Sequence, residues 1–126
     1  MFPMKLNVLI VSHGSREKSA NIDFKRLVNQ YGKRHKDWKV AHAFLDIARP
    51  SILEALGNLA KKKNLKKILV LPYFLFAAKH VKKDIPKILK SFRKKNPGIT
   101  VKFGKPLGSD SQLLDILDKR LSETKD

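Results

Sequence analysis

Apolar residues along this 126-residue chain form short continuous runs that alternate with stretches of helical spacing. The runs occupy residues 6–11, 39–45, 68–74 and 99–103. Short apolar runs bounded by polar turns are typical of β-strands that are covered on both faces. We therefore predict four buried strands in these segments.

Between and after these runs, apolar residues recur at intervals of three and four, the spacing that gathers side chains on one face of a helix. Each such segment predicts an amphipathic helix. The apolar positions of the four predicted helices are Phe24, Leu27, Val28 and Tyr31; Ile52, Leu56, Leu59 and Ala60; Val81, Ile85, Ile88, Leu89 and Phe92; and Leu113, Leu114, Leu117 and Leu121. Expected start signals are Pro50 with Ser51, Asp84 with Pro86, and Ser109 or Asp110.

Strands that alternate with helices indicate a parallel sheet with helices on both faces, because each crossover is right-handed and returns over the sheet. We predict one doubly wound α/β domain spanning residues 1–126, with a four-stranded parallel sheet. In the common 2-1-3-4 order, strands one and three flank the point where the strand order reverses, and ligands bind beyond the carboxyl ends of the strands there.

The amino-acid composition limits which partners and which metal ligands the protein can use. The formal net charge of +17 predicts attraction to polyanions without saying which one. Cysteine is absent, so the chain has no disulfide and no thiolate ligand, and a metal would need nitrogen or oxygen ligands. No signal peptide or membrane-spanning run is present, which leads us to expect a cytoplasmic protein that binds no membrane.

Two histidines are expected at this crevice. His13 follows strand one, and His80 follows the segment that leaves strand three, with Asp46 directly after strand two. Two imidazoles in one cleft are compatible with a metal site, a pair of general bases or two unrelated surface residues, and spacing alone leaves all three open. His35, near a helix end, and His42, within a strand, are expected to be structural or surface residues.

Other chemistry at the end of strand one is less well supported. Ser12 and Ser15 flank His13, but no G-x-S-x-G elbow is present. Gly14 and Ser15 could present N–H groups to an anion, although neither a dinucleotide nor a Walker motif is found. Gly14 is equally compatible with a simple turn.

Three motifs together resemble the small CbiX-type sirohydrochlorin chelatases, and the likeness runs through most of the chain. They are V-S-H-G-S-R at residues 11–16, F-L-D with P-S-I at residues 44–52, and L-P-Y-F-L at residues 71–75, followed by His80 and D-I-P at residues 84–86. The first motif alone is weak, whereas the combination at this spacing is specific.

The resemblance implies a chelatase fold and a lyase that inserts Co²⁺, with Ni²⁺ or Fe²⁺ as alternatives, into sirohydrochlorin or a related tetrapyrrole, as in cobalamin biosynthesis. It implies no permanently bound cofactor and a homodimer that mimics a two-lobed chelatase. His13 and His80 match the family's active-site histidines and inherit the roles of metal ligand and proton acceptor. Asp46 is a weaker candidate ligand or imidazole-orienting group. The candidate substrate contacts are Ser12, Gly14, Ser15, Arg16 and Lys79.

Neutral imidazole suits these divalent metals, and its unperturbed pKa of about 6.5 allows it to accept a proton at neutral pH. Two departures from the family are noted: Asp46 stands where Glu is frequent, and Ala77 with Ala78 where a Gly often precedes the second histidine. Tyr73, Phe74 and Phe76 are candidates for an apolar contact with the macrocycle or for core packing.

Two other functions remain as alternatives. One is a metal or tetrapyrrole carrier without catalysis on the same fold. The other is a basic nucleic-acid-binding module, which the charge alone suggests and which ranks behind, because the lysines are spread over several helices and no reading motif occurs. Nucleic acid is therefore not an expected partner.

Overall fold

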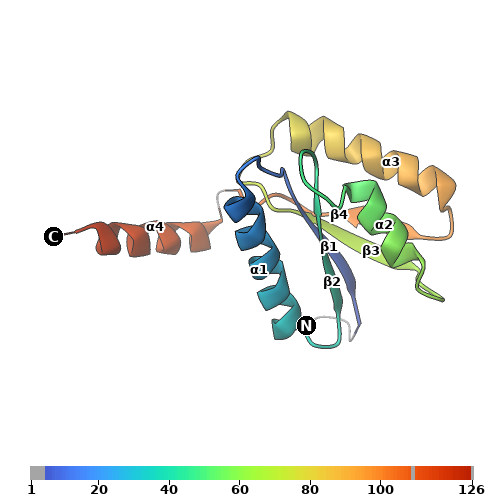
Figure 1. The fold of residues 1–126 in the computed structure, drawn as a ribbon, viewed down its shortest axis with the longest axis horizontal. Helices are drawn as coiled ribbons and strands as arrows, with labels where there is room; N and C mark the ends of the chain where they lie inside the picture. Colours follow the sequence, from blue (N-terminus) through green and yellow to red (C-terminus); the bar gives the residue numbers. More distant parts are fainter. Residues whose placement is uncertain (1–4, 109, 126) are drawn as a thin grey trace.

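The computed structural model of the protein describes residues 5–108 and 110–125 (Figure 1). Strands and helices alternate along the chain as the apolar pattern predicts. The elements are β1 (Asn7–Ser12), α1 (Lys18–Arg34), β2 (Lys39–Phe44), α2 (Ile52–Ala60), β3 (Lys67–Pro72), the π-helical turn η1 (His80–Asp84), α3 (Ile85–Lys95), β4 (Thr100–Phe103) and α4 (Ser111–Thr124).

The four strands form one parallel sheet in the order β2-β1-β3-β4, which confirms the predicted fold class and strand order. The register pairs Val8 of β1 with Val40 of β2 and with Leu69 of β3. The chain reverses its winding direction between β1 and β3, so their carboxyl ends flank the switch point. His13 follows one of these strands, and His80 follows the other.

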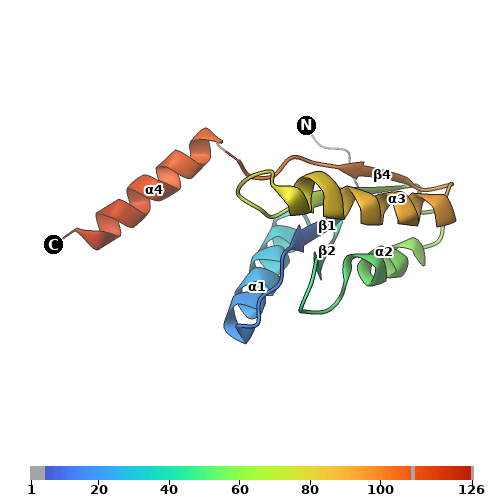
Figure 2. The same ribbon diagram turned by 90° about the horizontal axis from the view of Figure 1, so that it is seen from above.

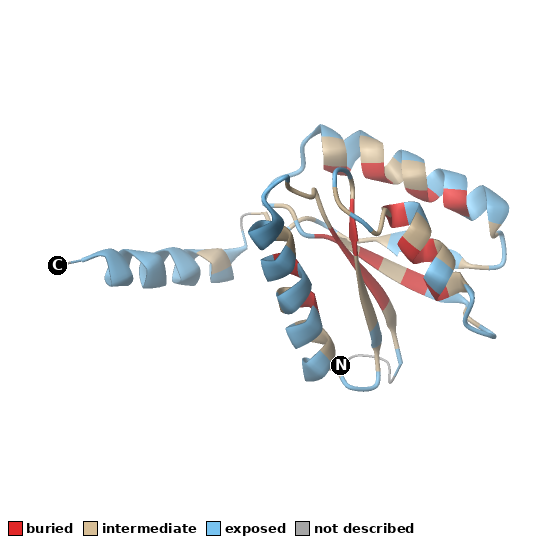
Figure 3. Ribbon diagram, viewed as in Figure 1, coloured by how far each residue is buried: buried red, intermediate tan, exposed pale blue. Residues whose placement is uncertain are grey.

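The core consists of two apolar clusters, one on each face of the sheet (Figure 3). On one face α2 and α3 cover the sheet, with Leu56 and Leu89 fully buried against Val70. On the other face α1 supplies Phe24 and Val28. The structure therefore has helices on both faces, but they are unevenly distributed.

Helix α4 departs from the expected layering. Its predicted N-cap is confirmed as Asp110, whose carboxylate accepts a hydrogen bond of 2.9 Å from the backbone N–H of Gln112, while Ser109 lies outside the described residues. No residue of α4 is buried, and the helix extends away from the sheet in both views (Figures 1 and 2). Periodicity correctly predicted a helix but could not reveal that none of the residues of α4 is buried.

Two other boundaries differ from expectation. Ser51 is the N-cap of α2, so Pro50 precedes the helix instead of occupying its first turn. The third helical segment opens at His80 with a π-helical turn, which places its start four residues before Asp84.

Among the described residues, none of the helices has both the length and the apolar character that a bilayer span requires.

The start of α2 is held by a reciprocal capping box. The Ser51 hydroxyl accepts a hydrogen bond from the N–H of Glu54, and the Glu54 carboxylate accepts one from the N–H of Ser51. We expect Ser51→Ala to lower the free energy of unfolding by about 1 kcal/mol, because a helical N–H then lacks its acceptor. Urea denaturation measures this, and Ser91→Ala on the exposed side of α3 is the control. A loss in the control as large as in Ser51→Ala would contradict the capping explanation.

Candidate active site

The strand pairing fixes the segment that carries His13. The carbonyl of Ser12 accepts a hydrogen bond from the N–H of Leu45, and the carbonyl of His13 accepts one from the N–H of Asp46, so pairing continues beyond the end of the strands. The N–H of Tyr73 donates to the carbonyl of Val11 on the other side. The histidine therefore leaves a backbone that is tied to both neighbouring strands.

The structure brings the two predicted histidines into contact. The ring centroids of His13 and His80 lie 4.7 Å apart, with an interplanar angle of 60°. Both residues are partly exposed to solvent. Residues separated by 67 positions in sequence thus form one imidazole pair at the switch point, where the sheet topology predicts a ligand site.

Hydrogen bonds define the protonation of both rings. His13 Nδ1 lies 3.0 Å from the carbonyl oxygen of Gly14, and His80 Nδ1 lies 2.8 Å from a carboxylate oxygen of Asp84. A carbonyl oxygen and an ionised carboxylate only accept, so Nδ1 is the donor in each bond. In the neutral imidazoles the lone pair therefore resides on Nε2. Each histidine has one nitrogen held by the protein and one that can bind a metal or take up a proton.

Asp84 is a site residue that the sequence reasoning used only as a helix start signal. It lies four residues after His80, and the two side chains meet across η1. The turn has the π-helical bond from the N–H of Ile85 to the carbonyl of His80, and buried Val81 anchors it to the core. The signal in the sequence was the i,i+4 spacing of a histidine and a carboxylate, which places both on one helix face.

Gly14 allows the chain to turn away from β1 directly after His13. Its φ is +95°, and a Cβ built on it would lie 2.0 Å from the carbonyl oxygen of Asp46. Any side chain at this position would collide with backbone. Gly14 is required for the close approach of the two loops, which is a more specific role than a generic turn.

The Asp46 carboxylate turns back on its own backbone and accepts a hydrogen bond of 2.8 Å from the N–H of Ile47. Within the described residues, no group of three or more histidine or carboxylate side chains is arranged to hold a metal ion. Asp46 as a metal ligand therefore stays a prediction. The contact that the structure gives it with the site is the backbone bond to His13.

The remaining predicted substrate contacts differ in how firmly the structure holds them and in how exposed they are. Ser15 is engaged in the turn: its N–H donates to Asn21 Oδ1, and its hydroxyl accepts from the N–H of Glu17. Ser12 is half-buried at the end of β1, whereas Arg16 and Lys79 are exposed. The two cations are therefore free to meet an anionic ligand.

The loop before His80 is apolar and exposed. Leu75 is 55% and Phe76 67% accessible to solvent, while Phe74 packs against the core. No positive φ occurs at Ala77 or Ala78, so the loop adopts ordinary backbone angles without glycine. Of the three candidate aromatics, Phe76 is the most exposed, whereas Tyr73 is 39% exposed and contacts Phe24.

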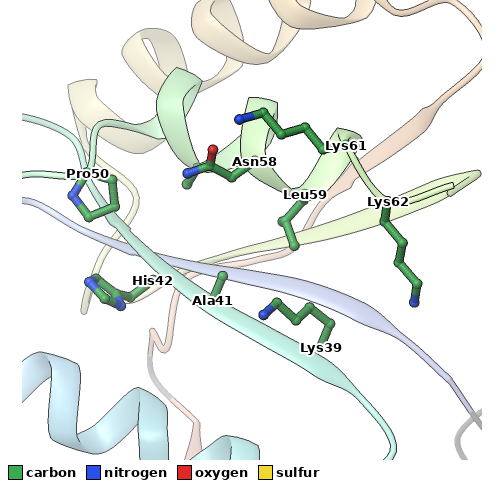
Figure 4. A pocket seen from close by; sticks show the side chains of 9 residues that line it. Lys39, Ala41, His42, Pro50, Asn58, Leu59, Lys61 and Lys62 are labelled. Atoms are coloured by element: carbon green, nitrogen blue, oxygen red, sulfur yellow. The ribbon is translucent and has the colours of Figure 1, made fainter.

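His35 and His42 lie apart from this pair, as the sequence analysis expected. His35 stacks on Trp38 at 3.7 Å beyond the end of α1. His42 lies in β2 and lines a hollow of about 710 Å³ beside that edge strand, with lysines around it (Figure 4). This hollow contains none of the residues predicted for the site.

Sequence and structure comparisons support the same relationship. The profile of the CbiX family matches residues 7–124. This chain belongs to the CbiX family. Its relatives include a sirohydrochlorin cobaltochelatase of Methanococcoides burtonii, 32% identical over 94% of this chain and 96% of that protein. The chloroplastic sirohydrochlorin ferrochelatase of Arabidopsis thaliana is also 32% identical, over 90% of this chain and 50% of that protein.

Among solved structures, the sirohydrochlorin chelatase SirB of Bacillus subtilis subspecies spizizenii, in complex with cobalt, matches with a TM-score of 0.84 and 29% identity. The match covers 94% of this chain and 50% of SirB. This chain therefore spans nearly the whole of the Methanococcoides burtonii protein but about half the length of the Arabidopsis thaliana protein and of SirB.

The close approach at Gly14 can be tested directly. We expect Gly14→Ala to lower the free energy of unfolding by at least about 2 kcal/mol, because alanine is strained at this φ and its Cβ meets a carbonyl oxygen. Gly57→Ala is the control, since nothing lies within 4 Å of a Cβ there and helix propensity predicts a gain of about 0.5–1 kcal/mol. Denaturant unfolding measures both, and equal effects would contradict the steric explanation.

Burial, and after it the charge of Lys25, lowers the pKa of His42 from its ordinary value of 6.5. The unfolded chain therefore binds a proton at higher pH than the folded chain, so the stability present above pH 6.5 decreases as pH falls below it. We expect His42→Gln to lose less stability than the wild type between pH 7 and 5. Thermal unfolding at each pH measures this, and parallel curves would refute it.

Proposed function

We propose that this chain inserts a divalent metal ion into sirohydrochlorin or a closely related tetrapyrrole. The observation that carries the proposal is the imidazole pair His13 and His80, in which each Nδ1 is held by an acceptor and neither Nε2 is hydrogen-bonded to a group within residues 5–108 and 110–125. The names of the relatives add support, since family members are called cobaltochelatases and ferrochelatases of sirohydrochlorin.

In the proposed mechanism each Nε2 has two successive roles, first as a metal ligand and then as a proton acceptor. The two nitrogens first hold the incoming ion and leave its other coordination positions to water or to substrate. Insertion forms metal–nitrogen bonds to the macrocycle, breaks the bonds to imidazole and releases two pyrrole protons. The two freed Nε2 atoms accept these protons, so two histidines match the proton balance of the reaction.

A site with few protein ligands suits transfer better than storage. A closed site with four ligands holds its metal as part of the structure, whereas open positions allow exchange. Two imidazoles without a third histidine or carboxylate among the described residues correspond to the open case. This favours a chelatase over a carrier that retains metal.

The surroundings of the His13–His80 pair suit a flat substrate that carries several carboxylates. Arg16 and Lys79 are exposed next to the histidines in sequence, and the chain has a net charge of +17 that would steer an anionic substrate to it. Phe76 offers an exposed aromatic face in the loop before His80. We propose Co²⁺ as the first metal to test, followed by Ni²⁺ and Fe²⁺, in a cytoplasmic enzyme of cobalamin synthesis.

We expect His13→Ala and His80→Ala each to abolish the acceleration of metal insertion, because the remaining imidazole can neither hold the ion in the pair nor accept both protons. An anaerobic absorbance time course of sirohydrochlorin with each metal, compared with the uncatalysed rate, measures this. His42→Gln is the control and retains the wild-type rate. A wild-type rate equal to background with all three metals would contradict catalysis, and binding without turnover would indicate a carrier.

Asp84 orients the His80 ring and favours the positive charge that the ring acquires when it accepts a proton. We expect Asp84→Asn to lower the insertion rate or the metal affinity by about 10- to 100-fold. Asp23→Asn, an exposed carboxylate of α1, is the matched control. An unchanged rate and metal affinity in Asp84→Asn would refute the assigned role.

A further inference from the structure

The ring of His13 is held by one peptide group, which joins Gly14 to Ser15 (the 14–15 peptide). The carbonyl oxygen of this peptide belongs to Gly14 and lies 3.0 Å from His13 Nδ1. Its N–H belongs to Ser15 and donates a hydrogen bond of 2.9 Å to Asn21 Oδ1. Because the carbonyl and the N–H of a trans peptide point in opposite directions, the 14–15 peptide lies between Asn21 on one side and His13 on the other.

The backbone alone restrains the 14–15 peptide only weakly. Rotation of a peptide group changes ψ of the residue before it and φ of the residue after it. Gly14 has no Cβ, so steric clashes restrict its ψ less than they restrict the ψ of any other residue. The glycine that the close approach to Asp46 requires therefore also loosens the carbonyl that accepts the hydrogen bond from His13.

Asn21 restrains this peptide with both ends of its side-chain amide. It accepts the hydrogen bond from the N–H of Ser15, and its Nδ2 donates one of 2.8 Å to the carbonyl oxygen of Ser15. Only one orientation of the amide satisfies both bonds, because its oxygen accepts and its nitrogen donates. The side chain therefore fixes the peptide groups before and after Ser15 together.

The position of Asn21 is fixed in turn by the core. Asn21 lies in α1 three residues before Phe24 and seven before Val28, a spacing that places all three on one helix face. Phe24 and Val28 are buried against the sheet, and Asn21 is partly buried. Asparagine is a poor helix former, because its side chain competes for backbone hydrogen bonds. The contacts with Ser15 supply a reason for asparagine at this position that the helix itself does not.

A hydrogen bond to the N–H of a peptide also polarises its carbonyl, because linked hydrogen bonds strengthen one another. We propose that Asn21 is a positioning residue for His13, acting through the 14–15 peptide to keep the proton on Nδ1 and the lone pair on Nε2. Asp84 does the same for His80 by direct contact. The use of this Nε2 in metal insertion rests on the proposed function, whereas the restraint on the ring does not.

The tautomer of each histidine in the metal-free protein tests the proposal. The ¹⁵N chemical shifts of an imidazole distinguish the nitrogen that carries the proton from the one that does not, and the spectra are recorded at about pH 8.5, where histidine is ordinarily neutral. We expect His13 to be predominantly Nδ1–H in the wild type and to lose this predominance to Nε2–H in Asn21→Ala. His80 is expected to keep its Nδ1–H form in both proteins.

Two control variants separate the effect on the peptide from a general loosening of the loop. Asn29→Ala replaces an exposed asparagine of the same helix. Ser15→Ala removes the hydroxyl that accepts from the N–H of Glu17 but leaves the 14–15 peptide and its bond to Asn21 in place. Both are expected to keep the wild-type tautomer of His13. Alanine is a better helix former than asparagine, so α1 remains folded in Asn21→Ala.

Co²⁺ affinity and the rate of metal insertion provide a second measurement. We expect Asn21→Ala to lower one of them about 10-fold, the smaller end of the range for groups that orient a ligand, and Asn29→Ala to leave both unchanged. An Asn21→Ala protein that is less stable but keeps Nδ1–H on His13 would overturn the proposal, because the role of Asn21 would then be structural only. Loss of Nδ1–H at His80 as well would overturn it too. A wild type without insertion refutes only the proposed function, since the tautomer is measured without metal.

Discussion

The pairing of β1 with β3 is the constraint on which the site depends. The N–H of Tyr73 donates to the carbonyl of Val11 at 2.7 Å, so the two strands end together at the sheet edge. His13 directly follows β1. His80 follows β3 after an intervening loop, at the first residue of the π-helical turn, and contacts His13 there. If this pairing slipped by one residue, the side chains would exchange faces and the imidazoles would separate.

The loops then orient the two histidines that the sheet brings close together. Because Gly14 has no side chain, the segment after β1 can approach the carbonyl of Asp46 closely. The carbonyl oxygen of Gly14 accepts the hydrogen bond from His13 Nδ1. The π turn places Asp84 against His80 Nδ1. The two rings are oriented by different acceptors, the carbonyl oxygen of Gly14 for His13 and the carboxylate of Asp84 for His80.

The sequence predicted those parts of the structure that depend on local pattern and on general topology. Continuous apolar runs indicated the strands, and the crossover rules indicated a parallel sheet with helices on both faces. The common 2-1-3-4 order of such sheets then placed His13 and His80 at one crevice. The role of Asp84 was missed because its carboxylate was interpreted as a helix start, although its spacing from His80 fits one helix face. The outward position of α4 could not be predicted, because an amphipathic stripe does not reveal which surface covers it.

The central claim is that one metal ion is held by Nε2 of both histidines while each Nδ1 keeps its proton. Proton NMR of the protein with bound Co²⁺ tests this most directly, since a ligating imidazole gives a strongly shifted exchangeable N–H signal. The account predicts two such signals in the wild type and the loss of one in each of His13→Ala and His80→Ala. Two signals that persist in both variants, or none in the wild type with Co²⁺ bound, would contradict it.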